Sequence, residues 1–214
     1  LEGLREHNNS IRGQNFFGKV INFLGLLRDS GIESAVMLTL TRDNMDQVIE
    51  LGEYLRGKTD HFTYNRLSPV GQGADLLLPD GVSDREFMDE YVTAAQNNPI
   101  MGYKDNLLNI VMEQRGLPLF DGCTGYGCGA AFNFLAVLPD GEVHACRKFP
   151  SRIGNVFEET LGGIYDSSKA SEYRNGPAEC SKCRLRAVCG GCQAIIQGCG
   201  MERTVNKDPH CFLS

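Results

Sequence analysis

The sequence predicts an α/β protein in two parts, and two observations support this. Residues 1–75 alternate helical periodicity with short apolar segments, which is typical of successive α/β units in a parallel sheet or a barrel fragment. Beyond residue 118 the chain is rich in Gly and Cys and has too few periodic apolar segments for a large core. We therefore expect an α/β portion over residues 1–80, a helical linker over 81–117 and a small metal-organised domain over 118–214.

Apolar spacing predicts the order helix, strand, helix at the start of the chain. Apolar residues recur at helical spacing within Gln14–Asp29, and Gly31 stands where a helix C-cap belongs. Ala35–Leu40 is a short apolar run that predicts a buried strand. Thr41 then has the chemistry of an N-cap for a second helix, which is expected to run through Tyr54.

The following segments predict another strand, two helices and a hairpin. Phe62–Leu67 is strand-like and leads into a turn-rich stretch. Ser83 and Glu86 have the spacing of a capping box for a helix that runs to Asn97, and another helix is expected over Lys104–Gln114. The hairpin is expected from Asn133–Leu138, the turn Pro139-Asp140-Gly141 and Glu142–Cys146.

The composition excludes several classes of protein. With 42% hydrophobic and 22% charged residues, this chain of 214 residues is globular rather than disordered. A net charge of -6 argues against nucleic acid or an anionic membrane as a partner, because both are bound by clustered Lys and Arg. The sequence has neither an apolar run long enough to span a bilayer nor a secretory signal, so we expect a cytoplasmic protein. Because it begins at Leu1 without Met, we also expect that preceding sequence is missing.

All nine cysteines lie after residue 122, in tight local spacings. The two groups are Cys123-x4-Cys128 followed by Cys146, and Cys180-x2-Cys183-x5-Cys189-x2-Cys192, with Cys199 and Cys211 trailing. An odd count with Cys-x-x-Cys pairs favours metal ligation over a disulfide scaffold. Glycines crowd both groups and let backbone N–H groups approach sulfur, which favours iron-sulfur clusters. Spacing alone also permits a zinc ribbon on Cys180, Cys183, Cys189 and Cys192, which would leave three cysteines over.

The complete pattern resembles the SPASM domain of radical S-adenosylmethionine (SAM) enzymes that modify peptides. The resemblance rests on Cys128-x12-Gly141-x4-Cys146, the second cysteine group, Cys211 and the linking segment 152–157. It implies one auxiliary 4Fe-4S cluster on Cys123, Cys128, Cys146 and Cys192, a second on Cys180, Cys183, Cys189 and Cys211, and a spare Cys199. One departure is that only Gly190-Gly191 separate Cys189 from Cys192, where the family commonly has three residues.

The first half resembles the later part of a radical SAM partial (β/α) barrel, through residues 9–13, 35–41 and 62–71. Residues 123–133 are similar to the thio(seleno)oxazole-type maturases. The resemblance implies that the whole enzyme modifies a ribosomally made precursor peptide, binds S-adenosylmethionine and a third 4Fe-4S cluster, and receives electrons from a low-potential donor such as ferredoxin or flavodoxin. The Cys-x3-Cys-x2-Cys motif for that third cluster does not occur in this sequence, so we expect the chain to be inactive alone.

Single residues outside the cysteines carry weaker predictions. Arg66 and Thr39 stand near the ends of predicted strands, where barrels place ligand-binding groups, so an S-adenosylmethionine or peptide pocket is expected there. A structural salt bridge is the alternative for Arg66. Arg147 follows Cys146 where anaerobic sulfatase maturases carry an Asp proposed as the base, and a guanidinium cannot take that role. His144 and His210 are expected to be packed or exposed histidines rather than ligands.

Three functional alternatives remain beside the peptide maturase. They are a zinc-organised interaction module, a ferredoxin-like electron carrier and an anaerobic sulfatase-maturase-like enzyme. The sequence identifies neither a catalytic residue nor the bond that is formed.

Overall fold

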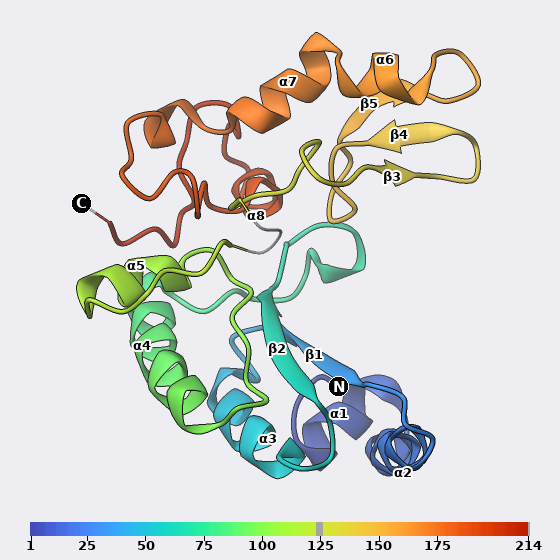
Figure 1. The fold of residues 1–214 in the computed structure, drawn as a ribbon, viewed down its shortest axis with the longest axis vertical. Coiled ribbons are helices and arrows are strands. Elements are labelled where there is room, and N and C mark those ends of the chain that lie inside the picture. Colours follow the sequence, from blue (N-terminus) through green and yellow to red (C-terminus); the bar gives the residue numbers. More distant parts are fainter. Residues whose placement is uncertain (123–125, 214) are drawn as a thin grey trace.

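The computed structural model describes residues 1–122 and 126–213, which form an α/β unit and a cysteine-rich unit stacked on it (Figure 1). The α/β unit contains α1 (Arg5–Arg12), α2 (Phe16–Asp29), β1 (Ala35–Leu40), α3 (Val48–Leu55), β2 (His61–Arg66), α4 (Gly81–Asn97) and α5 (Leu108–Gln114). Short 3-10 turns lie at Met45–Gln47 and Gly71–Gly73. β1 and β2 are parallel, with Ala35 opposite His61 and Leu40 opposite Arg66.

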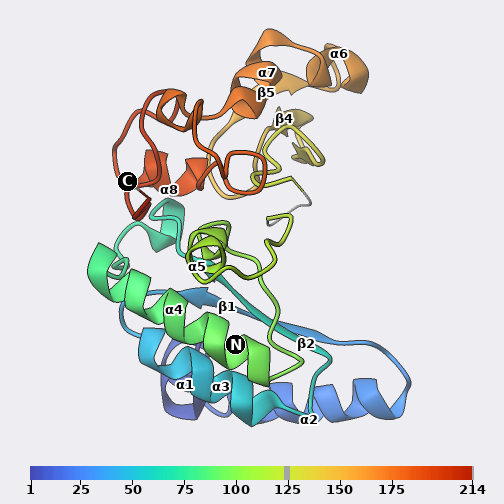
Figure 2. The ribbon, with the colours of Figure 1, turned by 60° about the vertical axis from the view of Figure 1, so that its left-hand side comes forward.

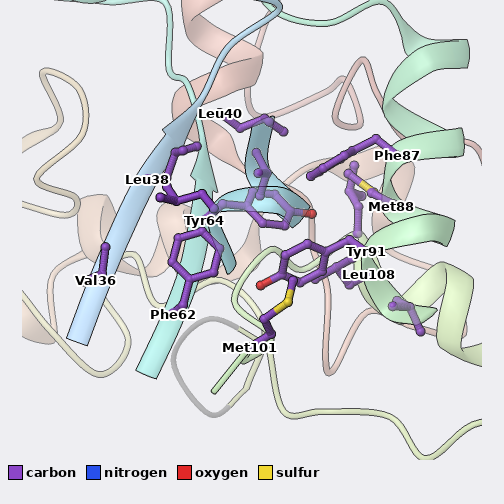
Figure 3. Close-up of a cluster of buried hydrophobic side chains, with 14 of the residues drawn as sticks. Val36, Leu38, Leu40, Phe62, Tyr64, Phe87, Met88, Tyr91, Met101 and Leu108 are labelled. Carbon is purple, nitrogen blue, oxygen red and sulfur yellow. The ribbon is translucent and has the colours of Figure 1, made fainter. Parts of the chain in front are cut away.

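One face of the β1–β2 pair forms the main core. Val36, Leu38 and Leu40 alternate with exposed residues along β1, and Phe62 and Tyr64 of β2 point to the same side. α4 covers this face, and its residues Phe87, Met88 and Tyr91 meet the strands (Figure 3). The Tyr64 ring lies edge-on to Tyr91, with 4.7 Å between the ring centroids. The period-two burial of β1 therefore follows from packing on one side only.

The cysteine-rich unit is built on a small antiparallel sheet. Its strands are β3 (Ala136–Val137), β4 (Glu142–His144) and β5 (Arg152–Asn155), in the order β3-β4-β5. α6 (Leu161–Tyr165), α7 (Ser168–Asn175), a 3-10 turn (Ala178–Cys180) and α8 (Gln193–Gly198) follow. A second, smaller core collects Val143, Ile153, Ile164 and Tyr173. β3 and β4 form the predicted hairpin with shorter strands, and β5 is an additional strand.

Most predicted elements are confirmed, often with shifted ends. The helix expected over Gln14–Asp29 is α2, which begins at Phe16 and ends at Asp29, while α1 before it is an additional helix. Gly31 follows α2 as expected, with a φ of +69° and an N–H that donates to the carbonyl oxygen of Arg28 at 3.0 Å. The last helix of the α/β unit begins at Leu108 instead of Lys104.

Two cap predictions are wrong. Helix α3 begins only at Val48, after a 3-10 turn, so Thr41 does not cap it. Instead the Asn44 side chain accepts the Thr41 N–H at 2.8 Å and donates to the Thr39 carbonyl oxygen at 2.9 Å. α4 begins two residues before Ser83, because the Asp80 carboxylate accepts the N–H groups of Val82 and Ser83.

The two units share a closely packed boundary at the C-terminal end of the strands (Figures 1 and 2). α4 and α5 belong to the same core as β1 and β2, so the expected linker 81–117 is packed against the sheet. Asn109 at the start of α5 donates to the carbonyl oxygens of Phe120 and Val188, both at 2.9 Å. The domain boundaries at residues 80 and 117 stay predictions. Among the described residues, no helix is long and apolar enough to cross a membrane.

Candidate iron-sulfur cluster sites

A cavity of about 130 Å³ lies between the two units and is called cavity I here. Three cysteines of the first predicted set line it: Cys128 before β3, Cys146 just after β4, and Cys192 directly before α8. The rest of the wall comes from both units and includes Asn65 and Arg66 at the end of β2. Cys123, the fourth member of the predicted set, lies outside the described residues.

A second cavity, cavity II, lies between α5 and the cysteine-rich loops. It is lined by all four cysteines of the second predicted set: Cys180, Cys183, Cys189 and Cys211. Its other walls are largely apolar, with Leu107, Ile110, Leu185 and Leu213. Apolar walls keep water away from a bound cluster and so influence its reduction potential.

A hydrogen-bonded turn fixes Cys146. Its N–H donates to the Ser151 Oγ at 2.9 Å, and the N–H of Lys148 points to the Cys146 Sγ at 3.5 Å. Ser151 in turn donates its own N–H to the His144 Nδ1 at 2.9 Å. That bond makes Nδ1 an acceptor, so the Nε2–H faces Glu142 at 3.1 Å. His144 therefore supports the cysteine turn, which agrees with the expectation of a packed histidine.

Asp208 fixes the backbone of Cys192. Its Oδ2 accepts the Cys192 N–H at 3.0 Å and a hydrogen bond from Arg66 at 2.7 Å, while its Oδ1 accepts the His210 N–H at 3.0 Å. His210 is itself buried and pairs through Nδ1 with Asp84 at 2.8 Å. Because Cys211 follows His210 directly, the Asp208 carboxylate fixes the backbone at Cys192 of cavity I and next to Cys211 of cavity II.

Asn106 fixes the Cys189–Cys192 loop at both ends. Its side-chain amide donates to the carbonyl oxygens of Cys189 at 2.9 Å and Gly191 at 3.2 Å. The Gly191 N–H points to the Cys189 Sγ at 3.4 Å. N–H groups directed at a thiolate sulfur stabilise its negative charge and tune the reduction potential of a bound cluster.

The shifts in the thiol pKa values agree with the division of the cysteines between cavity I and cavity II. Burial raises the pKa of Cys146, and the neighbouring Cys192 adds to the rise. Burial also raises the pKa of Cys180, with Cys211 and Cys183 as the next contributions, and burial raises the pKa of Cys189. Since a cluster binds thiolates, cluster formation must displace protons from these side chains.

The four cysteines of the zinc-ribbon alternative are divided between the two cavities, with Cys180, Cys183 and Cys189 lining cavity II and Cys192 lining cavity I. Cys192 lines cavity I with Cys128 and Cys146, and Cys211 lines cavity II with Cys180, Cys183 and Cys189. Within residues 1–122 and 126–213, His, Cys, Asp and Glu side chains form no group of three that would hold a single metal ion. The remaining Cys199 is exposed at the end of α8 and lines neither cavity.

Arg66 and Thr39 have different surroundings. Arg66 is buried, and its guanidinium pairs with Asp105 at 2.7 Å and with Asp208 at 2.7 Å, which is the salt-bridge alternative. It also lines cavity I. Thr39 lies on the exposed face of β1, opposite Asn65, and is not part of the cavity wall. Sequence reasoning missed Asp105, Asn106 and Asp208, which have no motif of their own.

The sequence of residues 128–193 matches the SPASM family, an iron-sulfur cluster-binding domain. This region of the chain is therefore similar to SPASM domains. The match starts at the first cavity I cysteine that the structure describes and ends directly after Cys192. It covers the hairpin, both helices that follow and the whole second cysteine group, Cys180 to Cys192.

Curated relatives extend the likeness to the α/β unit. AlbA, a subtilosin biosynthesis protein of Bacillus subtilis, is 28% identical over 87% of this chain and 42% of its own length. The mycofactocin maturase MftC of Mycolicibacterium smegmatis is 27% identical over 96% of this chain and 54% of its own length. The chain thus spans about half the length of the curated relatives it matches.

Solved structures show the same fold. Streptococcus suis SuiB bound to S-adenosylmethionine aligns with a TM-score of 0.63 and 21% identity over 90% of this chain and 48% of SuiB. SuiB bound to its precursor peptide SuiA aligns with a TM-score of 0.61 and 20% identity over the same shares of the two chains. The predicted fold class, an α/β portion followed by a small SPASM domain, is confirmed.

Proposed function

We propose that this chain is the C-terminal part of a radical SAM enzyme that modifies a ribosomally made peptide. The observation that carries the proposal is the division of seven cysteines between two cavities, in the sets that two auxiliary 4Fe-4S clusters require. Cys123 completes the first set in the proposal. The SPASM match and the resemblance to AlbA, MftC and SuiB support the enzyme class.

The two cavities suit different tasks. When bound, the clusters supply sites that accept and pass on single electrons. Cavity II is enclosed by apolar side chains, which favours a buried relay. Cavity I adjoins Asn65 and Arg66 at the strand ends, where parallel α/β folds bind their ligands. A peptide held there lies between the half-barrel and the first auxiliary cluster.

The proposal assigns the rest of the reaction to the remainder of the enzyme. S-adenosylmethionine and a third 4Fe-4S cluster belong there, because the sequence of this chain lacks the Cys-x3-Cys-x2-Cys motif. The partners proposed are the precursor peptide and a low-potential electron donor such as ferredoxin or flavodoxin. The likeness of residues 123–133 to thio(seleno)oxazole-type maturases gives the proposed subtype.

Iron, acid-labile sulfide and zinc contents of the anaerobically reconstituted chain test the proposal. About eight irons with equal sulfide are expected for two clusters. About one zinc without sulfide would mean a structural zinc site and would end the proposal. The Cys199→Ser variant is the matched control, because Cys199 lines neither cavity. Its iron content is expected to equal that of the unmodified chain.

A double variant tests the ligand sets themselves. Cys183→Ser and Cys192→Ser are each expected to lose about four irons, and the double variant nearly all of them, because the two residues line different cavities. If both residues served one centre, as in the zinc ribbon, the double variant would lose no more metal than either single variant. That result would overturn the division between cavities I and II.

A further inference from the structure

Three cationic side chains line cavity I. Lys104 comes from the segment between α4 and α5, and Arg147 and Lys148 come from the turn after β4. They therefore approach the cavity from both units. Among the described residues, none of the three has a carboxylate within ion-pair distance, whereas the fourth cation of the cavity, Arg66, is saturated by Asp105 and Asp208. This is a local excess of positive charge in a chain whose net charge is -6.

Contacts hold two of these cations in place. The Arg147 guanidinium lies 5.5 Å from the centroid of the Phe134 ring, and Phe134 also lines the cavity. Stacking of this kind positions the guanidinium and leaves its N–H groups available. The Lys148 Nζ reaches across the boundary and donates to the carbonyl oxygen of Arg66 at 3.4 Å. Its ammonium group is therefore held at the end of β2, beside the cavity.

We propose that Lys104, Arg147 and Lys148 form an anion-binding rim that receives a carboxylate of the substrate peptide. An arginine fork and two ammonium groups match an Asp or Glu side chain, and charge-assisted hydrogen bonds are the strongest of the ordinary kinds. The substrate class is then a peptide with an acidic residue close to the residue that is modified. This inference rests on the proposed function, since it assumes that a peptide binds at the α/β side of cavity I, next to the first auxiliary cluster.

Peptide binding to the cluster-loaded chain tests the rim. The probes are a fluorescein-labelled peptide of Gly and Ser with a central Glu-Glu pair, and the same peptide with Gln-Gln. Fluorescence anisotropy at low ionic strength is expected to give roughly tenfold or more tighter binding of the Glu peptide, which is the discrimination typical of charge-assisted contacts. The preference is expected to shrink as salt is added.

The triple variant K104Q/R147Q/K148Q is expected to bind both peptides equally. Glutamine keeps a hydrogen-bond donor at each position and removes the charge. Arg152→Gln is the matched control, because Arg152 is an exposed arginine of the same unit that pairs with Glu142 and does not line cavity I. It should keep the preference for Glu.

Two results would overturn the rim. One is that the unmodified chain binds the Glu peptide no better than the Gln peptide, or binds neither. The other is that the triple variant keeps the preference but shifts the reduction potential of a cluster, which would mean that the cations balance cluster charge. Iron and sulfide measured on the same samples separate this failure from that of the proposed function. A chain with full clusters and no preference refutes only the rim.

Discussion

Replacing Arg66 with Met should destabilise the chain strongly, because Arg66 is the buried partner of two carboxylates. Its side chain is 1% exposed, Asp208 is 1% exposed and Asp105 is 7% exposed. Burial alone would raise the pKa of Asp208, but Arg66 outweighs that effect and holds the pKa below its usual value. Arg66 therefore favours the ionised form of the buried Asp208 carboxylate.

The size of the effect follows from what the variant leaves behind. Arg66→Met keeps a side chain of similar length but leaves Asp105 and Asp208 buried without a counter-charge. Removing one partner of a buried ion pair costs about 3–5 kcal/mol. For a domain of this size, each kcal/mol lowers the unfolding midpoint by about 2–4 °C, so a fall of roughly 6–20 °C is expected.

Thermal unfolding of the cluster-loaded chain, followed by circular dichroism under anaerobic conditions, measures this fall. Arg56→Met is the matched control, because Arg56 pairs with Glu53 on the surface at 2.9 Å, with both side chains more than two fifths exposed. Its midpoint should stay within error of the unmodified chain. An Arg66→Met midpoint as close to the original as that of Arg56→Met would refute the reasoning. Adding Asp208→Asn to Arg66→Met should recover part of the loss, since it removes one unpaired charge.

Three other predictions concern the core, a loop and pH. Leu38→Ala, in a fully buried strand position, should lower the free energy of unfolding by about 2–5 kcal/mol, whereas Met37→Ala on the exposed face should change it by less than about 0.5 kcal/mol in the same urea titration. Gly190→Ala should cost about 1–2 kcal/mol because its φ is +67°, while the new Cβ would meet only the Cβ of Cys128, at an ordinary contact distance of 4.0 Å. Gly191→Ala should cost more and lower the iron content as well, because its Cβ would stand 2.8 Å from the Cβ of Asp208. Hydrogen bonds from the backbone and the side chain of Ser34 lower the pKa of Asp60 in the folded chain. Ionised Asp60 therefore stabilises the fold above 3.8, the pKa of the unfolded chain, and this stabilisation is lost as the pH falls through the lower pKa of the folded chain. Below pH 3.8 the thermal unfolding midpoint of Asp60→Asn should therefore fall less steeply with pH than that of the original chain. Plots of midpoint against pH that run parallel for the two chains would contradict this.

Local sequence signals were enough for most of the elements but not for their ends. The apolar period of α2 and the alternation of β1 are set by residues close together in the chain, so both could be predicted. Asp80 and Ser83 are both good N-caps, and nothing in the local sequence chooses between them. The choice depends on where the apolar face of α4 meets the sheet, which is a tertiary effect.

The candidate site also combines features that the local sequence predicts with features that only tertiary packing decides. Spacing identified the cysteines, but it assigned Cys192 equally well to a zinc ribbon, and its placement beside Cys128 and Cys146 was expected only from the family resemblance. The two carboxylate partners of Arg66 could not be predicted, because Asp105 is 39 residues away in the chain and Asp208 is 142 residues away. An Asp without a motif acquires its role only when the two units pack together.

The short Cys189–Cys192 loop shows how a departure from the family pattern can be accommodated. With two residues between the cysteines, the chain must turn sharply, and both Gly190 and Gly191 have left-handed φ values of +67° and +64°. Two successive residues of this kind are strained unless both are Gly. The turn sends Cys189 to cavity II and Cys192 to cavity I, while Asn106 holds its carbonyl oxygens. The loss of one residue is thus compatible with the same division of ligands, because the glycines supply the turn that the third residue would otherwise provide.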